Sequence, residues 1–419
     1  MPIKAPRGTK DILPKDSYKW TYVENLFREV CSLFGYDEIR TPVFESTDLF
    51  KRGVGETTDI VQKEMYSFQD NGGRDITLKP EGTAGAVRAF IENKLYADAQ
   101  PSKLFYITPC FRYERPQAGR MRQFHQFGIE AFGSESASID AEVMALAMEF
   151  FKRVGLEKLE LRVNSIGCPK CRSEYNDKLR GYLKEKLDTL CGTCQTRYEK
   201  NPLRILDCKN EACQSQIKDA PLMIDNICDD CKDHFEKVNL YLDSMGINYV
   251  VDPKIVRGLD YYTKTAFEII SQDIGAQSTV CGGGRYDGLV EQLEGPKTPG
   301  IGFGMGIERL LLTLENNNIE IPKEEGIDIF VVTIGEKAEI ESFKILKALR
   351  SNNVSCDKDH VGKSVKAQFK YSDKINSKYT IVLGDDEIEK DLATLKNMQT
   401  SEQTEIKLSE IADVLKNMI

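Results

Sequence analysis

The sequence has no long hydrophobic run, only one tryptophan and only three histidines. Its longest apolar stretches, such as 329–334, are far shorter than the roughly 18–20 residues that span a bilayer, so we expect no membrane segment. The first residues, MPIKAPRGTKDILP, lack the apolar core of a secretory signal, and we expect a cytoplasmic protein. A net charge of −9, from 57 Lys and Arg against 66 Asp and Glu, excludes a globally basic nucleic-acid coat protein but allows a local basic patch.

The phosphate-binding loop G-x-x-x-x-G-K-[ST] is also missing, and the three histidines, His125, His234 and His360, are few candidates for acid–base catalysis. The composition is that of a folded protein with a sizeable hydrophobic core, since 41% of its 419 residues are hydrophobic and 29% are charged. At roughly 100–200 residues per domain, this length predicts two to four domains.

Hydrophobic periodicity places the regular elements along the chain. Apolar residues at spacings of three and four predict helices, and short alternating or β-branched runs predict strands. The predicted helices cover 17–34, 137–154, 306–316, 338–350 and 408–418, and the predicted strands cover 38–46, 103–108, 123–132, 160–165, 265–271, 328–334 and 379–383. Proline and charge at 318–326 indicate a linker, and the alternation beyond it predicts a small α/β domain.

Eight of the 12 cysteines fall within 168–231, among polar residues that favour helices, which indicates an inserted module. Their spacing predicts one four-thiolate set from the Cys-x2-Cys pairs Cys168, Cys171, Cys191 and Cys194, and a second from Cys208, Cys213, Cys228 and Cys231. Such sets suit tetrahedral Zn²⁺ with a structural role, and free thiols are the alternative, because disulfides are rare in a reducing compartment. His234 is either a spare ligand or a surface residue.

The segment 123–130 combines side chains that an apolar core would not choose. Since residues two apart share one face of a strand, Phe124, Gln126, Gly128 and Glu130 line up together, as do Arg112 and Glu114 just before them. A flat ligand could stack on the aromatic ring while the polar groups accept and donate hydrogen bonds. The loop between the two segments carries Arg115, Arg120 and Arg122, which suit phosphate contact. A solvated hairpin with cross-strand ion pairs remains the alternative.

Glycines recur at every second position of 300–306, so one face of the predicted strand has no side chains. A planar ligand could lie directly on the backbone there. Arg309 follows in the first turn of the next helix, where the helix dipole disfavours a cation, and it could reach a phosphate. The alternative is a strand packed tightly under a helix.

Together with several other segments, these residues resemble the class II aminoacyl-tRNA synthetases, and within them the histidyl-tRNA synthetase family. The segments are RTPVFE (40–45), LKPEGTAG (78–85), FRYERPQAGRMRQFHQFGIEAFG (111–133), RGLDYYTKTAFE (257–268), TVCGGGRYDGLVEQL (279–293), PGIGFGMGIERL (299–310) and GKSVKAQFKYSDK (362–374). They follow the family's order over essentially the whole chain.

The resemblance implies an α+β catalytic domain over 1–325, built on a six-stranded antiparallel sheet, with a Cys-rich, mainly helical insertion at 168–250. It also implies an α/β anticodon-binding domain over 326–419 and a homodimer. The implied reaction joins histidine and ATP, with Mg²⁺, into histidyl-adenylate. The histidyl group then passes to the 3′ end of tRNA(His).

The resemblance further implies roles for single residues. The catalytic pair would be Arg112, which clamps the histidine carboxylate and the α-phosphate, and Arg257, which lies over the α-phosphate. The ATP site would comprise Arg112, Glu114, Phe124 and Arg309. The histidine site would comprise Glu81, Thr83, Gln126, Glu130, Tyr261 and Tyr262. The tRNA acceptor end would meet Arg115, Gln117 and Arg120.

The stretch 344–378 is strongly basic inside an acidic protein. It holds nine Lys or Arg against three acids, a net charge of +6. This charge favours contact with the phosphates of tRNA, and a solvated helix face is the alternative.

Two rival functions fit parts of the pattern. A non-catalytic, histidine-sensing paralogue, the regulatory subunit of ATP phosphoribosyltransferase, typically lacks the terminal domain and loses the catalytic arginines, whereas this chain keeps Arg112, Arg257 and Arg309. A class II synthetase for another amino acid would not carry RGLDYY and GGGRYDG, which supply the histidine pocket.

Overall fold

The computed structural model describes residues 2–418 apart from 56–57, 209, 272–278 and 324–325. The chain divides into two compact units, Met1–Ile321 and Pro322–Ile419. The predicted linker 318–326 spans this boundary, and two of its residues, 324–325, lie outside the described residues. Within the described residues, no helix has the length and apolar character needed to cross a bilayer.

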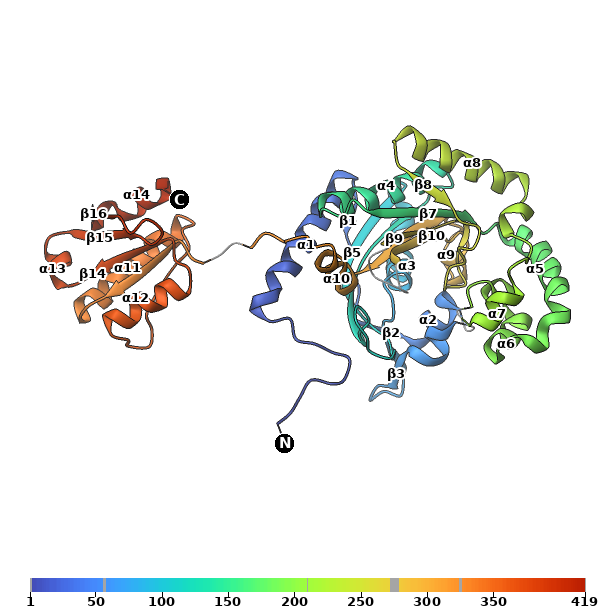
Figure 1. Ribbon diagram of the computed structural model, residues 1–419, viewed down its shortest axis with the longest axis horizontal. Coiled ribbons are helices and arrows are strands. Elements are labelled where there is room, and N and C mark those ends of the chain that lie inside the picture. The colour runs from blue at the N-terminus through green and yellow to red at the C-terminus, as the bar shows by residue number, and fades with distance from the viewer. Residues whose placement is uncertain (1, 56–57, 209, 272–278, 324–325, 419) are drawn as a thin grey trace. The chain divides into compact units, whose positions relative to one another are not determined.

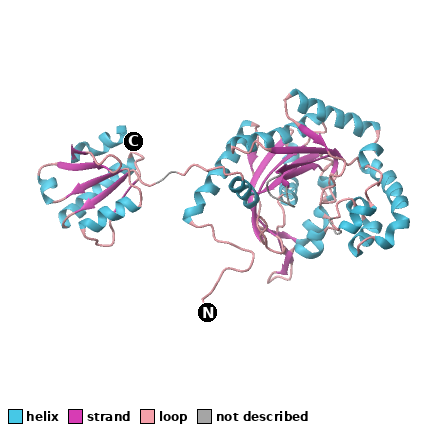
Figure 2. Ribbon diagram, in the orientation of Figure 1, coloured by secondary structure: helices cyan, strands magenta, loops and turns pink. Residues whose placement is uncertain are grey.

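An eight-stranded mixed sheet forms the centre of the first unit (Figures 1 and 2). Its six inner strands are antiparallel, as the resemblance implies, and a short parallel strand is added at each edge. The order across the sheet is β1 (Asp37–Glu38), β5 (Ser102–Phe111), β6 (Gln123–Phe132), β11 (Gly300–Gly306), β10 (Thr279–Arg285), β9 (Thr263–Ser271), β7 (Leu159–Ser165) and β8 (Tyr249–Val251).

Alternation along β6 and β11 separates the core from the polar face. Phe127 and Ile129 on β6, and Phe303 on β11, are buried in the main apolar cluster, while the glycines and polar residues between them point the other way. Phe27 stacks on Phe127 with ring centroids 4.5 Å apart, which fixes the N-terminal helix against the sheet. The period-two pattern seen in the sequence therefore separates the residues that pack in the core from those on the polar face of the sheet.

The helices of the first unit lie on both faces of the sheet. Those on the apolar face are α1 (Pro14–Leu33), α4 (Ala137–Arg153), α8 (Asp229–Ser244) and α10 (Ile307–Asn316). The remaining helices outside the insertion are α2 (Thr47–Val54), α3 (Thr83–Glu92) and α9 (Leu289–Gln292). A small second sheet has the order β2 (Phe44–Ser46), β4 (Asp75–Leu78) and β3 (Tyr66–Gln69).

The cysteine-rich insertion consists of helices and loops, as predicted (Figure 2). Its helices α5 (Pro169–Leu183), α6 (Gly192–Lys200) and α7 (Glu211–Gln216) gather beside the sheet, and α8 leads back to it (Figure 1). The insertion has its own apolar cluster, which includes Tyr175, Leu179 and five of its cysteines. Val256, which precedes the predicted RGLDYY loop, is buried in the same cluster, so the insertion packs directly on that loop.

The second unit is the α/β domain that the alternation predicts. A five-stranded sheet has the order β13 (Cys356–Lys358), β12 (Ile329–Thr333), β14 (Tyr379–Leu383), β15 (Leu392–Asn397) and β16 (Gln403–Lys407), with parallel pairs among the first three strands. Its helices are α11 (Glu336–Ser351), α12 (Val365–Lys374), α13 (Asp385–Glu389) and α14 (Ile411–Met418). Ile345 and Leu349 of α11 and Leu415 of α14 are part of the apolar core of this unit.

Candidate active site

A pocket on the polar face of the central sheet gathers residues that are far apart in the sequence. It is bounded by the β6, β10 and β11 strands, by the start of α3, and by the loop 257–262. Of the predicted site residues, it is lined by Glu81, Thr83, Arg112, Glu114, Arg120, Phe124, Gln126, Arg257, Tyr261, Tyr262 and Arg309. Glu130, Arg115 and Gln117 do not line it.

Arg257 is the most enclosed cation of the pocket. Its guanidinium forms an ion pair with Glu268 and lies 5.4 Å from the ring centroid of Tyr262. Although burial lowers the pKa of Arg257, the Tyr262 hydroxyl and the Glu268 carboxylate raise it above the usual value. Its Nε is buried without a hydrogen-bond partner among the residues that the structure describes. A charged group with one donor unused is suited to an anionic ligand.

Arg112 is held in place from several sides. Its Nε donates to the Pro80 carbonyl oxygen at 2.8 Å, its Nη1 lies 3.8 Å from Glu114 Oε1, and its guanidinium is 5.2 Å from the Phe124 ring centroid. Arg120 Nη1 forms a closer contact with Glu114, at 3.0 Å. Glu114 therefore aligns two arginines at the edge of the pocket, with an aromatic ring beside them.

Glu81, Thr83 and Gln126 form a polar group at the start of α3. The buried Glu81 carboxylate accepts hydrogen bonds from the backbone N–H groups of Thr83 and Ala84, both at 2.8 Å. Burial nevertheless raises the pKa of Glu81. Gln126 Oε1 accepts from the Gly82 N–H at 2.9 Å, so its amide NH₂ is oriented by the same turn.

Glu130 lies behind this group, fully buried. Tyr106 donates a hydrogen bond to its Oε1 at 2.9 Å, and Tyr286 donates to its Oε2. Burial raises the pKa of Glu130 to about 8, even though hydrogen bonds from the two tyrosines oppose the shift. Burial thus favours the neutral carboxyl, which the two tyrosine hydroxyls hold in place. Sequence analysis missed Tyr106 and Tyr286; the available indication was Gly128, which pairs with Tyr106 across the strands.

The glycines of β11 make room for side chains of the neighbouring strand. A Cβ at Gly302 would collide with Glu130, and one at Gly304 would collide with Gln126. The predicted bare backbone face is therefore wrong at Gly302, where the Glu130 side chain from β6 fills the space. At Gly304 the Gln126 side chain lies over the backbone, but Gly304 still lines the pocket. The face remains open at Gly306, whose Cβ would meet only Arg309, at 3.9 Å. Arg309 Nη1 donates to the Thr279 carbonyl oxygen at 2.6 Å, which ties α10 to β10.

Arg115 and Gln117 are exposed in the loop between β5 and β6. The backbones of Gln117 and Arg120 exchange two hydrogen bonds, of 3.0 and 2.9 Å, which makes the tip of the loop a tight turn. Arg122 lies 3.9 Å from the Tyr113 ring centroid. The loop thus presents cations outside the pocket as well as within it.

The cysteines form two four-sulfur groups, but not those that the spacing predicted. Cys168, Cys171, Cys228 and Cys231 form one group, here called the stem site. Cys191, Cys194, Cys208 and Cys213 form the other, called the tip site. The predicted pairing is wrong because the insertion folds back on itself, so its first and last pairs meet at its base. Within each group, all sulfur atoms lie within 4.8 Å of one another.

The histidines have other partners. His234, expected to be a spare ligand or a surface residue, instead places Nε2 2.8 Å from Asp140 Oδ2, with only 10% of its side chain exposed. His125 contacts Trp20 edge-on, with ring centroids 4.9 Å apart, on the side opposite the pocket-lining Gln126. His360 lies in a loop, 3.4 Å from Asp357.

Comparison with known proteins gives consistent matches over the whole chain. A family model described as Histidyl-tRNA synthetase matches residues 8–310, and one described as Anticodon binding domain matches residues 328–418. The chain is 69% identical to a histidine–tRNA ligase of Clostridioides difficile (strain 630), with all of both chains covered. It is 64% identical to one of Alkaliphilus oremlandii, with 98% of each covered. The crystal structure of apo Staphylococcus aureus histidyl-tRNA synthetase superposes with a TM-score of 0.86 at 44% identity, covering 99% of this chain and 100% of that one.

Proposed function

Because the chain belongs to the histidyl-tRNA synthetase family, we propose that it acts as a histidine–tRNA ligase, a class II aminoacyl-tRNA synthetase. The observation that carries this proposal is the convergence of Arg112, Arg257 and Arg309 with the polar group at the start of α3 in one pocket. We assign histidine activation to the unit Met1–Ile321 and anticodon binding to Pro322–Ile419.

The activation step needs cations rather than a general base. A histidine carboxylate is already ionised at pH 7, and the barrier to its attack on the α-phosphate is crowded negative charge. We assign Arg112 to the carboxylate and α-phosphate, Arg257 to the α-phosphate and Arg309 to the γ-phosphate. Phe124 would stack on adenine, beside the Arg112 guanidinium that already lies over its ring.

Selection of histidine would rest on polar groups that line the pocket and on the Glu130 carboxyl, which lies buried behind them. Glu130 and Tyr262 would contact the imidazole, with Tyr261 beside them, while Glu81, Thr83 and Gln126 would hold the α-ammonium group. The two tyrosines fix the position of the Glu130 carboxyl, which would share a hydrogen bond with one imidazole nitrogen. An apolar analogue would leave these buried groups unpaired, and rejection by about 10⁴–10⁵ is attainable in such a site.

ATP would enter with Mg²⁺, which binds mainly phosphate oxygens and water and takes few protein ligands. Two acidic residues, Glu114 and Glu308, line the pocket beside the arginines, and the Glu308 carboxylate also accepts hydrogen bonds from His125. We further propose a cytoplasmic homodimer, as expected for this family. The histidine-sensing regulator is not favoured, because relatives at 56–69% identity over nearly the full length are named histidine–tRNA ligases.

The first prediction is that ATP–pyrophosphate exchange occurs with histidine and with no other amino acid. The assay offers each of the twenty amino acids separately with ATP and labelled pyrophosphate. Exchange with a different amino acid would contradict the proposal. Absence of all exchange, with histidine still raising the melting temperature, would assign the chain to the regulatory class instead.

Arg115, Gln117 and Arg120 are proposed to contact the tRNA acceptor end, and the basic stretch 344–378 to contact tRNA phosphates. Not every cation of that stretch is available. Lys358 is buried and 3.2 Å from Glu339 Oε1, and Lys378 is paired with Asp328 at 2.7 Å. Exposed cations on α11 and α12 include Lys347, Lys366 and Lys370.

The second prediction concerns this surface. The double variant Lys366→Glu/Lys370→Glu should raise KM for tRNA about tenfold and reduce the salt dependence of tRNA binding by about one unit of slope per lost phosphate contact. Histidine-dependent exchange should stay unchanged, because no tRNA takes part in it. The matched control is Lys337→Glu/Lys390→Glu, which reverses two charges that are exposed on the same unit but lie outside the stretch 344–378. An equal effect from both variants would contradict a specific contact.

Each four-cysteine group is proposed to hold one structural Zn²⁺. A tetrahedral zinc with bonds of about 2.3 Å places its sulfurs about 3.8 Å apart. The stem site has sulfur–sulfur distances of 3.5, 4.0 and 3.9 Å, and the tip site one of 3.9 Å. Cys168, Cys191 and Cys228 also occupy N-cap positions of helices, where the helix dipole favours a thiolate.

A further inference from the structure

The stem site is linked to the proposed histidine pocket through the residue that follows its second cysteine. Arg172, adjacent to Cys171 on α5, donates from Nη2 to the Tyr262 carbonyl oxygen at 2.7 Å. Tyr262 lines the pocket and lies in a loop without regular secondary structure. The position of this loop therefore depends on where α5 begins, and that point is Cys168, the N-cap of the helix.

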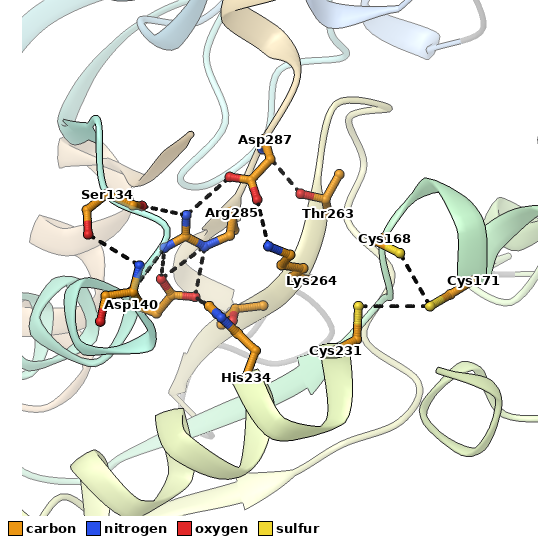
Figure 3. A network of polar contacts seen from close by, with 12 residues as sticks. Ser134, Asp140, Cys168, Cys171, Cys231, His234, Thr263, Lys264, Arg285 and Asp287 are labelled. Atoms are coloured by element: carbon orange, nitrogen blue, oxygen red, sulfur yellow. Dashed lines mark hydrogen bonds and ion pairs between the residues drawn. The ribbon is translucent and has the colours of Figure 1, made fainter. Parts of the chain in front are cut away.

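A second connection starts at the other half of the stem site (Figure 3). His234, one turn after Cys231 on α8, contacts the buried Asp140, which in turn pairs with the buried Arg285. Arg285 immediately precedes Tyr286, the donor to Glu130. Thr265 also donates to Asp140 Oδ2, at 2.6 Å, so β9 and β10 are both held by this network.

Both halves of the stem site thus touch the segments proposed to recognise histidine. α5 reaches the loop 257–262, and α8 reaches the strand end that carries Tyr286. A metal that joins Cys168 and Cys171 to Cys228 and Cys231 fixes the starts of α5 and α8 relative to each other. The tip site is less directly connected. Arg197 of α6 contacts Asp59, and Asn201, the C-cap of α6, donates to Asp260 in the loop 257–262, but neither aspartate lines the pocket. Arg172, by contrast, binds the backbone of the pocket-lining Tyr262.

We propose that the Zn²⁺ of the stem site braces the histidine pocket, with Arg172 as the positioning residue that transmits its effect to Tyr262. This inference rests on the proposed function, because it takes the pocket to be a histidine site. The metal does not touch the reactants, and no step of the reaction passes through it. Its effect falls on histidine binding and, through Arg257 beside Tyr262, on kcat. KM for ATP should change little, since neither connection ends at Arg309 or Phe124.

The third prediction tests this with four variants of the full chain. The native protein should contain two Zn²⁺ per chain, and Cys228→Ser/Cys231→Ser and Cys208→Ser/Cys213→Ser should each contain one. The stem variant should raise KM for histidine about tenfold and leave KM for ATP within about twofold, whereas the tip variant should leave both within about threefold. Arg172→Met should keep both metals and still raise KM for histidine, with partial recovery in Arg172→Lys.

Metal content and calorimetric histidine binding are read independently of activity. If the native protein, produced in medium with ample zinc, contained less than about 0.2 zinc ions per chain, the inference would be overturned. So would a stem variant or an Arg172→Met variant that binds histidine as the native chain does. If the native chain showed no exchange with histidine, the proposed function would fail instead, and the metal counts would remain interpretable.

Discussion

Replacing Arg257 with glutamine should lower kcat for histidine-dependent ATP–pyrophosphate exchange by about 10²–10³. The guanidinium lies against β10, where a Cβ at Gly282 would collide with it, and Glu268 fixes its direction. A cation held so rigidly stabilises developing charge without reorganising at the moment of reaction. Glutamine retains hydrogen-bond donors but not the charge, and it is too short to reach the same position.

Two further measurements separate catalysis from folding. Arg257→Lys keeps the charge but loses the planar fork, so its kcat should fall between those of the native chain and Arg257→Gln. Arg162→Gln serves as the matched control, since Arg162 also bridges acidic side chains on the same sheet but lies outside the pocket. A decrease of less than about threefold for Arg257→Gln, with histidine and ATP still bound, would remove Arg257 from the catalytic pair.

The local periodicity of the sequence predicted which side chains share a face of each strand. The parity of β6 predicted that Phe124 and Gln126 would share the polar face, and both line the pocket. The glycines of β11 predicted a strand without side chains on that face, but not what fills the space. Whether a ligand or a neighbouring side chain occupies the space above a glycine depends on strand register, which one strand's sequence does not contain.

Non-local contacts were the part that spacing did not predict. The cysteines were grouped by nearness in the sequence, whereas the chain reverses direction within the insertion and brings Cys168 to Cys231. The partners of Glu130 come from β5 and from the residue after β10, on either side of β6 in the sequence. Only the three-dimensional arrangement shows that these tyrosines fix a buried carboxyl.

The buried pair of Asp140 and Arg285 was also missed, and its removal should have the largest effect on stability. Asp140→Asn should lower the free energy of unfolding by about 3–5 kcal/mol, because it leaves the Arg285 charge buried with only Asp287 as a carboxylate partner. Both side chains of the pair have 0% exposure. Urea unfolding followed by the fluorescence of Trp20, the single tryptophan, reports on the unit that contains the pair.

The burial of the arginine that is left unpaired determines how much stability each substitution removes. Asp252→Asn is the matched control: Asp252 forms a similar ion pair with Arg162 at 3.0 Å, but the Arg162 side chain is 35% exposed, so water can solvate the charge left behind. Asp252→Asn should lower the free energy of unfolding by less than about 1 kcal/mol.

The double variant Asp140→Leu/Arg285→Met removes both charges and should regain part of the stability lost by Asp140→Asn. The recovery stays incomplete because the Ser134 and Ser136 carbonyl oxygens lose their donor. An Asp140→Asn chain as stable as the Asp252→Asn chain would show that the buried pair does not hold β10 and α4 together.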